Sequence, residues 1–87
     1  MSQENTSLFK VEELDAEMTR LTLNEVYEAL QERGYDPVNQ IVGYLISGDP
    51  GYISSYKDAR KKMLSIDRAS VIAILLKGFL KWNLKRL

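Results

Sequence analysis

Residues 34–53 concentrate the helix-breaking residues of this chain. The stretch reads GYDPVNQIVGYLISGDPGYI and holds four of the five glycines and both prolines. Because glycine ends helices and proline begins them, the chain is expected to turn back on itself more than once here. On either side of the stretch there is no strand-like alternation of apolar and polar residues. The sequence therefore predicts an all-α fold, a compact bundle of about four to five short helices.

The segment before this stretch divides into a tail and a helix. Residues 1–14 mix polar side chains with few apolar anchors, so we expect a flexible tail there and a single helical domain over residues 15–87. The first helix is predicted to begin at Asp15 or at Thr22, where Glu25 completes a capping-box pattern. It ends before Gly34, because glycine enters the left-handed conformation without steric cost. The expected buried side of this helix consists of Leu23, Val26, Tyr27 and Leu30.

The stretch itself predicts a second helix and a short helical turn. Asp36 is placed to cap a helix that ends at Gly48, and the Asp-Pro pair at residues 49–50 repeats the same start signal. Gly43 in mid-helix costs about 1 kcal/mol relative to alanine, which a close helix crossing would explain. The expected buried side consists of Val38, Ile41, Val42, Leu45 and Ile46. The residues given a structural role by this organisation are Gly34, Pro37, Asn39, Gln40, Gly43, Gly48, Asp49 and Pro50.

Two further helices are predicted after the stretch. The first runs from Ser55 to about Ile66, with lysines on its outer side, and the second from Arg68 to about Leu84, capped by Asp67. The last helix is apolar on more than one side, which is typical of a buried helix. A chain this small has little surface of its own to cover it, so we expect a second subunit to do so.

The residue types present exclude several kinds of site. The chain has no cysteine and no histidine, so disulfides and the usual zinc, copper and haem ligand sets are excluded, and we expect no metal or cofactor. General-base histidine and thiol chemistry are absent as well, which argues against an enzyme. The loop Ser-Gly-Asp-Pro-Gly at residues 47–51 lacks the Gly-Lys-Ser/Thr ending of a phosphate-binding loop. Asp49 is therefore interpreted as a helix cap.

The zero net charge conceals a division between the halves of the chain. Residues 1–40 carry nine acidic and three basic side chains, whereas residues 41–87 carry three acidic and nine basic ones. We expect the halves to attract each other, within one chain or between two. The N-terminal residues lack the layout of a signal peptide, and the longest apolar run, residues 71–76, is too short to span a membrane. A cytoplasmic protein is expected.

Two binding functions compete on composition alone. Short helices and a basic segment resemble the outline of a small DNA-binding dimer, and the cationic, aromatic C-terminal helix resembles a membrane-surface helix. Overall neutrality weakens the first, so no nucleic acid is expected, and a dimer helix with a cationic end explains the second. The cations that would contact phosphate groups or a protein partner are Lys57, Arg60, Lys61, Lys62 and Arg68.

The central sequence resembles a known family. Residues 26–35 read VYEALQERGY, residues 37–45 PVNQIVGYL, residues 47–50 SGDP and residues 57–60 KDAR. This pattern closely resembles the IreB/ReoM family of small bacterial regulatory phosphoproteins over about residues 24–60, and more thinly as far as Arg68. The resemblance implies an intertwined all-helical homodimer without enzymatic activity.

The same resemblance implies a signalling role. Family members are substrates of a membrane PASTA-type Ser/Thr kinase, and a PP2C-type phosphatase reverses the modification. Their phosphorylation state governs cell-wall homeostasis by controlling the turnover of an enzyme that makes a peptidoglycan precursor. Thr6, which precedes Leu8 and Phe9, best matches the phosphoacceptor of the family. A phosphate there would add nearly two negative charges for basic residues such as Lys57, Arg60 or Arg68 to capture.

Overall fold

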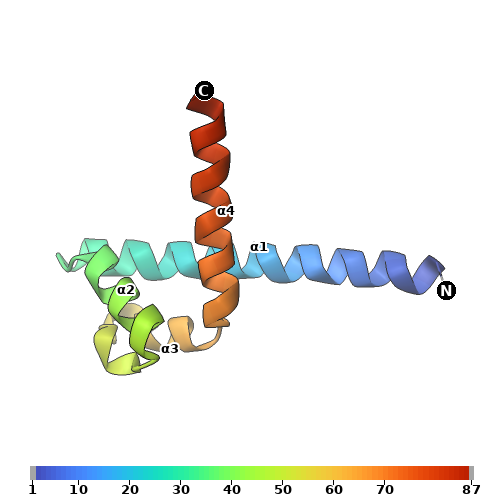
Figure 1. Ribbon diagram of the computed structural model, residues 1–87. Helices are drawn as coiled ribbons and strands as arrows, with labels where there is room; N and C mark the ends of the chain where they lie inside the picture. The colour runs from blue at the N-terminus through green and yellow to red at the C-terminus, as the bar shows by residue number, and fades with distance from the viewer. Residues whose placement is uncertain (1, 87) are drawn as a thin grey trace.

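The computed structural model describes the backbone of residues 2–86 and the side chains of residues 15–84. The elements in chain order are α1 (Ser2–Glu32), α2 (Pro37–Ser47), the 3₁₀ turns η1 (Pro50–Tyr52) and η2 (Tyr56–Asp58), α3 (Ala59–Leu64) and α4 (Arg68–Arg86). The all-α prediction is confirmed, since residues 2–86 contain helices and turns but no strand. Helix α1 is a long rod with α2 and α3 at one end, and α4 crosses its middle and projects away (Figure 1).

Helix α1 begins at Ser2, so the predicted starts at Asp15 and Thr22 are wrong. No glycine or proline interrupts residues 2–33, and the backbone at Thr22 is already helical, which leaves this residue nothing to cap. The predicted end is correct. Gly34 takes a φ of +89°, and the Tyr35 N–H donates to the carbonyl of Leu30 at 3.0 Å, closing the helix in a Schellman-type turn.

The caps predicted for the central stretch are present. The Asn39 N–H donates to Asp36 Oδ1 at 3.2 Å at the start of α2, and Pro37 occupies the first turn. Helix α2 ends where Gly48 adopts a φ of +76° and its N–H donates to the carbonyl of Tyr44 at 2.7 Å. In η1 the Asp49 carboxylate accepts from the Gly51 N–H at 2.9 Å, so Asp49 is a cap as interpreted. These elements are specified locally, by one side chain and its nearest backbone groups.

The single helix predicted from Ser55 to Ile66 is wrong. The backbone breaks at Lys57 (φ +50°) and Asp58 (φ +62°), Ser55 makes no side-chain cap bond, and α3 begins at Ala59. Left-handed backbone is costly for residues other than glycine. The turn allows both Ile53 and Ala59, each 0% exposed, to enter the core. At the next start, the Ser70 N–H donates to Asp67 Oδ2 at 3.0 Å, which is the predicted cap of α4.

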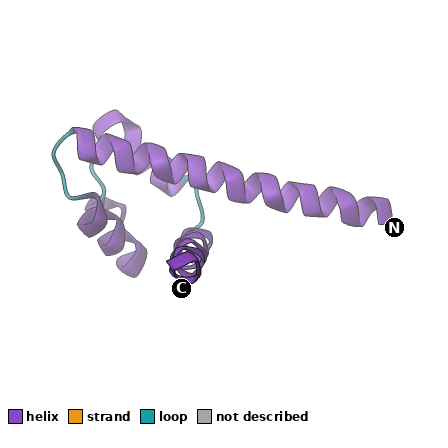
Figure 2. Cartoon of the chain, turned by 90° about the horizontal axis from the view of Figure 1, so that it is seen from above, coloured by secondary structure: helices purple, strands orange, loops and turns teal. Residues whose placement is uncertain are grey.

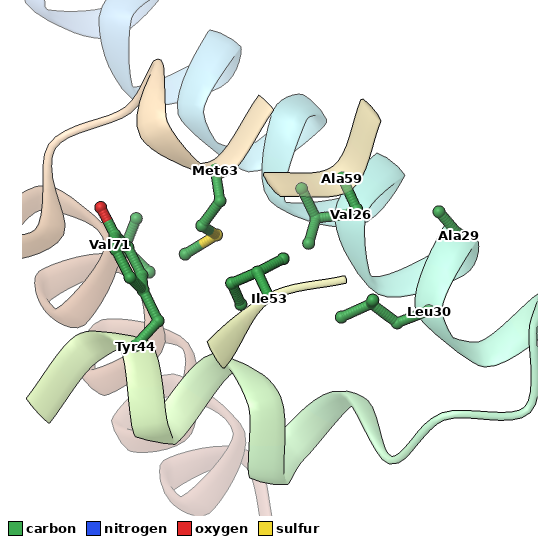
Figure 3. Packing of buried hydrophobic residues seen from close by; sticks show 8 residues of the cluster. All are labelled: Val26, Ala29, Leu30, Tyr44, Ile53, Ala59, Met63 and Val71. Carbon is green, nitrogen blue, oxygen red and sulfur yellow. The ribbon is translucent and has the colours of Figure 1, made fainter. Parts of the chain in front are cut away.

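The core lies between the second half of α1, α2, α3 and the first turn of α4. Figure 3 shows its eight buried apolar side chains converging on Ile53, which enters from the loop after η1. Leu30, Ile53, Met63, Val26 and Val71 are the largest of those that are fully buried. The eight side chains of the cluster come from five separate segments, so this small cluster fixes the positions of all the helices relative to α1. The buried residues are Val26, Ala29, Leu30, Tyr44, Ile53, Ala59, Met63 and Val71.

Candidate interaction surfaces

An apolar groove runs between α1, α2 and α4. Its first part has a volume of about 330 Å³, and a second part of about 600 Å³ continues from it between α2 and α4. Val42, Leu45 and Leu75 line both parts, so the two form one continuous surface. We call this surface the apolar groove; it is lined by Leu23, Asn24, Tyr27, Val38, Ile41, Val42, Leu45, Ile46, Ile72, Leu75, Leu76 and Phe79.

The buried side predicted for α2 is only partly correct. Val38 is 64% exposed and Ile46 80% exposed, and the residue of α2 that enters the core is Tyr44. The periodicity identified the apolar side of the helix correctly, but in this single chain that side forms a wall of the apolar groove. An apolar surface of this extent marks a binding site for a protein or a membrane.

Helix α4 contributes the other wall of the groove and extends well beyond it. Seen from above, α4 is viewed almost along its axis and stands apart from α2 and α3 (Figure 2). Phe79 is 58%, Trp82 56% and Leu84 69% exposed. Only the beginning of this apolar helix is buried, at Val71, so the expected covering surface is not supplied by the described part of the chain.

Lys57 contacts an acidic residue of α1. Its Nζ lies 2.8 Å and 3.1 Å from the two oxygens of Glu32, and the Tyr56 hydroxyl donates to the same carboxylate at 3.0 Å. The hydrogen bond from Lys57, supported by that from Tyr56, holds the pKa of Glu32 below its ordinary value of 4.5. The same bond raises the pKa of Lys57. This pair ties the strained η2 turn to the end of α1.

The other basic residues of α3 differ in how they are held. Lys62 Nζ lies 3.4 Å from a carboxylate oxygen of Glu25, about two turns of α1 before Glu32. Arg60 Nε donates to the carbonyl of Ile53 at 2.8 Å. Lys61 is exposed, and among the side chains of residues 15–84 it has no ion-pair partner. Lys61 is thus the member of the predicted set with all its donors directed to solvent.

Arg68 lies at a different corner of the molecule, between α4 and the end of α2. Its Nη1 donates to the carbonyl of Leu45 at 3.0 Å, and its guanidinium lies 5.9 Å from the centroid of the Tyr44 ring. The guanidinium also packs on Gly48, where an added Cβ would lie 2.9 Å from it. Arg68 therefore joins the first turn of α4 to the C-terminal end of α2. The five predicted cations do not form one open surface.

The sequence predicted these cations as binding residues, but not the acidic residues that pair with two of them. Glu25 was predicted only to complete a capping box, and no role was predicted for Glu32. The signal that could have identified them is the division of charge between the halves of the chain. The expected attraction between the halves is present within a single chain, as the pairs Glu25–Lys62 and Glu32–Lys57.

The remaining predicted residues, apart from Thr6, lie within the described part of the chain. The Gln40 side-chain oxygen accepts from the Ser54 N–H at 2.9 Å and so holds the loop after η1 against α2. Asn39 contributes its backbone N–H to the cap, and its side chain is exposed. Gly43 faces the ring of Tyr52 rather than another helix. The side chain of Thr6 lies outside the described residues.

The described residues lack two kinds of site. No group of three or more acidic side chains with metal-binding geometry occurs there. None of the described helices is both long enough and apolar enough to cross a membrane.

Comparison with protein families gives one match that spans most of the chain. The family model described as IreB regulatory phosphoprotein matches residues 4–81. The matched range includes Thr6, all five predicted cations and both walls of the apolar groove.

Proposed function

The chain belongs to the IreB family of regulatory phosphoproteins, and on this basis we propose that it is a non-enzymatic regulator in a Ser/Thr kinase pathway. In this proposal the kinase is of the PASTA type, a PP2C-type phosphatase reverses its action, and both meet the protein in the cytoplasm. The regulated process is cell-wall homeostasis, through the turnover of an enzyme that makes a peptidoglycan precursor. The observation that carries the proposal is the family match, which extends over the N-terminal segment with its candidate acceptor.

Thr6 is the proposed phosphoacceptor. It stands in a polar segment two residues before an apolar pair, Leu8 and Phe9, which is the arrangement that the family resemblance associates with the modified threonine. Phosphorylation would add about two negative charges to a segment that already carries Glu4, and would change which basic surfaces the segment contacts. A protein partner that discriminates between the two forms would then transmit the signal.

The working unit in this proposal is a homodimer. The apolar groove and the exposed side of α4 support it, because a second copy of the chain presents the same apolar surfaces and would cover them reciprocally. Exposed residues such as Ile46 and Phe79 are of the kind found at the centre of obligate interfaces.

No observation favours the DNA-binding alternative. Of its candidate phosphate ligands, Lys57 and Lys62 contact carboxylates of α1, and Arg60 and Arg68 donate to backbone carbonyls. A duplex would have to compete with these contacts. A salt-dependent affinity for duplex DNA in a filter-binding assay would revive this alternative.

The proposal is tested by mass spectrometry of the protein isolated from its own cells, with and without phosphatase treatment. We expect a single phosphate that maps to Thr6. Thr6→Ala and Thr6→Glu variants should then have opposite effects on resistance to cell-wall stress. Absence of phosphate under growth and under antibiotic stress, or wild-type behaviour of both variants, would contradict the proposed switch.

A further inference from the structure

Helix α4 crosses α1 near the middle of the long rod (Figure 1). A second groove, lined by cations, lies between these two helices. It has a volume of about 430 Å³. Arg20 from α1 and Lys77 and Lys81 from α4 supply its charged lining, and Ala16, Ile74 and Gly78 its apolar lining. We call it the crossing groove. None of these three cations belongs to the set predicted from the sequence, and among the side chains of residues 15–84 no acidic residue lines the groove.

The crossing groove and the apolar groove use opposite sides of α4. Ile74, Lys77, Gly78 and Lys81 follow the spacing of one helix face. Ile72, Leu75, Leu76 and Phe79, which line the apolar groove, follow the same spacing two residues earlier. An offset of two residues is a rotation of about 200° on a helix. A second copy seated in the apolar groove would therefore leave the crossing groove open.

The charges around the crossing groove are only partly compensated. Arg20 Nη2 lies 2.8 Å from an oxygen of Glu17, one turn earlier on α1. Among the side chains of residues 15–84, Lys77 and Lys81 have no carboxylate partner. Like charges at positions i and i+4 of a helix repel each other. An anion held between these lysines and Arg20 would remove that repulsion and gain charge-assisted hydrogen bonds.

We propose that the crossing groove binds the N-terminal segment of a second copy of this chain when its Thr6 is phosphorylated. The phosphate would lie between Arg20, Lys77 and Lys81, while the apolar pair Leu8 and Phe9 would lie on the apolar lining of the groove. This proposal rests on the proposed function for the phosphate on Thr6, but it places the phosphate at cations other than those that contact Glu25 and Glu32.

Helix geometry selects the second copy as the source of the segment. Helix α1 is continuous from Ser2 to Glu32, so Thr6 lies fourteen residues, or about 21 Å, from Arg20 along the same rod. A chain cannot bring its own Thr6 to its own crossing groove without unwinding α1. The segment of another copy has no such restriction.

The test is a titration of full-length Thr6→Ala protein with a synthetic peptide of residues 1–14 that carries phosphothreonine at position 6, followed by fluorescence anisotropy. The unphosphorylated peptide should bind at least about tenfold more weakly. A Lys77→Gln/Lys81→Gln protein should lose at least about tenfold in affinity, whereas the matched Lys61→Gln/Lys62→Gln protein should bind as before. The proposal would be overturned if the two double variants bound the phosphopeptide equally well. It would also be overturned if only the Lys61→Gln/Lys62→Gln protein lost affinity.

Gly78→Leu gives a test that keeps every charge. An added Cβ at Gly78 meets no atom of the described side chains within 4 Å, and leucine is a better helix former than glycine, so this variant should fold at least as well. Its side chain would occupy the groove, and phosphopeptide affinity should fall as far as in the lysine double variant. Unchanged affinity would contradict the groove as the site.

The outcomes separate this proposal from the proposed function. Phosphate on Thr6 in cells, without binding of the peptide to the crossing groove, would overturn the groove and leave the phosphorylation standing. Binding of the peptide at the groove, without phosphate on Thr6 in cells, would support the site and overturn the switch.

Discussion

The ring of Tyr52 lies directly on Gly43, so close that a Cβ added to the glycine would overlap Cδ1 of the ring. The close neighbour of this mid-helix glycine is thus an aromatic side chain from η1. Gly43→Ala should destabilise the protein by about 1 kcal/mol, because overpacking costs about 1–3 kcal/mol and the gain in helix propensity returns only about 1. Urea denaturation at fixed protein concentration measures the difference.

Two controls identify the ring as the cause. Gly78→Ala, in the open middle of α4, should instead stabilise the protein by up to about 1 kcal/mol. In a Tyr52→Ala background, Gly43→Ala should become neutral or stabilising, because the obstructing ring is gone. A cost for Gly43→Ala that persists without Tyr52 would show that the contact is not its origin.

The proposed homodimer makes a prediction for α4. Phe79→Glu places a charge on the apolar groove, where it would be buried by a second copy, and should raise the dissociation constant of the dimer at least about tenfold. Analytical ultracentrifugation over a range of concentrations measures the constant. The control is Ala73→Glu, which adds the same charge to the same helix at an exposed position that does not line the groove. Equal effects of the two variants would argue against this surface as the interface.

The features predicted correctly from the sequence are those that depend on neighbouring residues. The caps at Asp36, Asp49 and Asp67 and the stops at Gly34 and Gly48 each involve one side chain or one φ value and backbone groups within a few residues. Such signals are complete in the sequence, because no distant residue decides whether they form.

The features that were missed depend on contacts between distant residues. The backbone break at Lys57 and Asp58 allows Ile53 and Ala59 to be buried. It also allows Lys57 to contact Glu32. Local helix propensity cannot predict such contacts, because they involve residues far apart in the sequence. The start of α1 was missed for a different reason. Thr22 has the residue type and spacing of a cap, but an uninterrupted helix leaves it no free N–H group to accept from.

The candidate site was predictable only in part, and Arg68 shows why. The sequence placed it among possible phosphate ligands, whereas the structure has it donating to the carbonyl of Leu45 beside the Tyr44 ring. We predict that Arg68→Lys lowers the free energy of unfolding by about 1 kcal/mol. Lysine lacks the planar guanidinium group, which donates to the Leu45 carbonyl and lies beside the Tyr44 ring. Lys61→Ala, at an exposed cation, should leave the free energy of unfolding unchanged. Thermal denaturation of the two variants in parallel distinguishes a cation that stabilises the fold, Arg68, from an exposed cation that does not, Lys61.

The pair formed by Glu32 and Lys57 predicts how stability depends on pH. The pKa of Glu32 is lowered in the folded chain, so its contribution is present above its unfolded value, near 4.5, and is lost as the pH falls through the lower folded value. The pKa of Lys57 is raised, so its contribution is present below its unfolded value, near 10.5, and is lost as the pH rises through the higher folded value. The pair therefore stabilises the fold across the whole neutral range.

Glu32→Gln isolates the acid side of this dependence. Glutamine keeps an oxygen that can accept from Tyr56 but removes the charge that holds Lys57. The difference in unfolding free energy between wild type and variant should be constant from about pH 6 to 9 and should shrink below about pH 4.5, where the wild-type carboxylate takes up its proton. Urea titrations at a series of pH values measure it. Because both side chains are half-exposed, added salt should also reduce the difference at neutral pH. A difference that stays constant into strong acid would mean that Glu32 contributes through packing rather than through its charge.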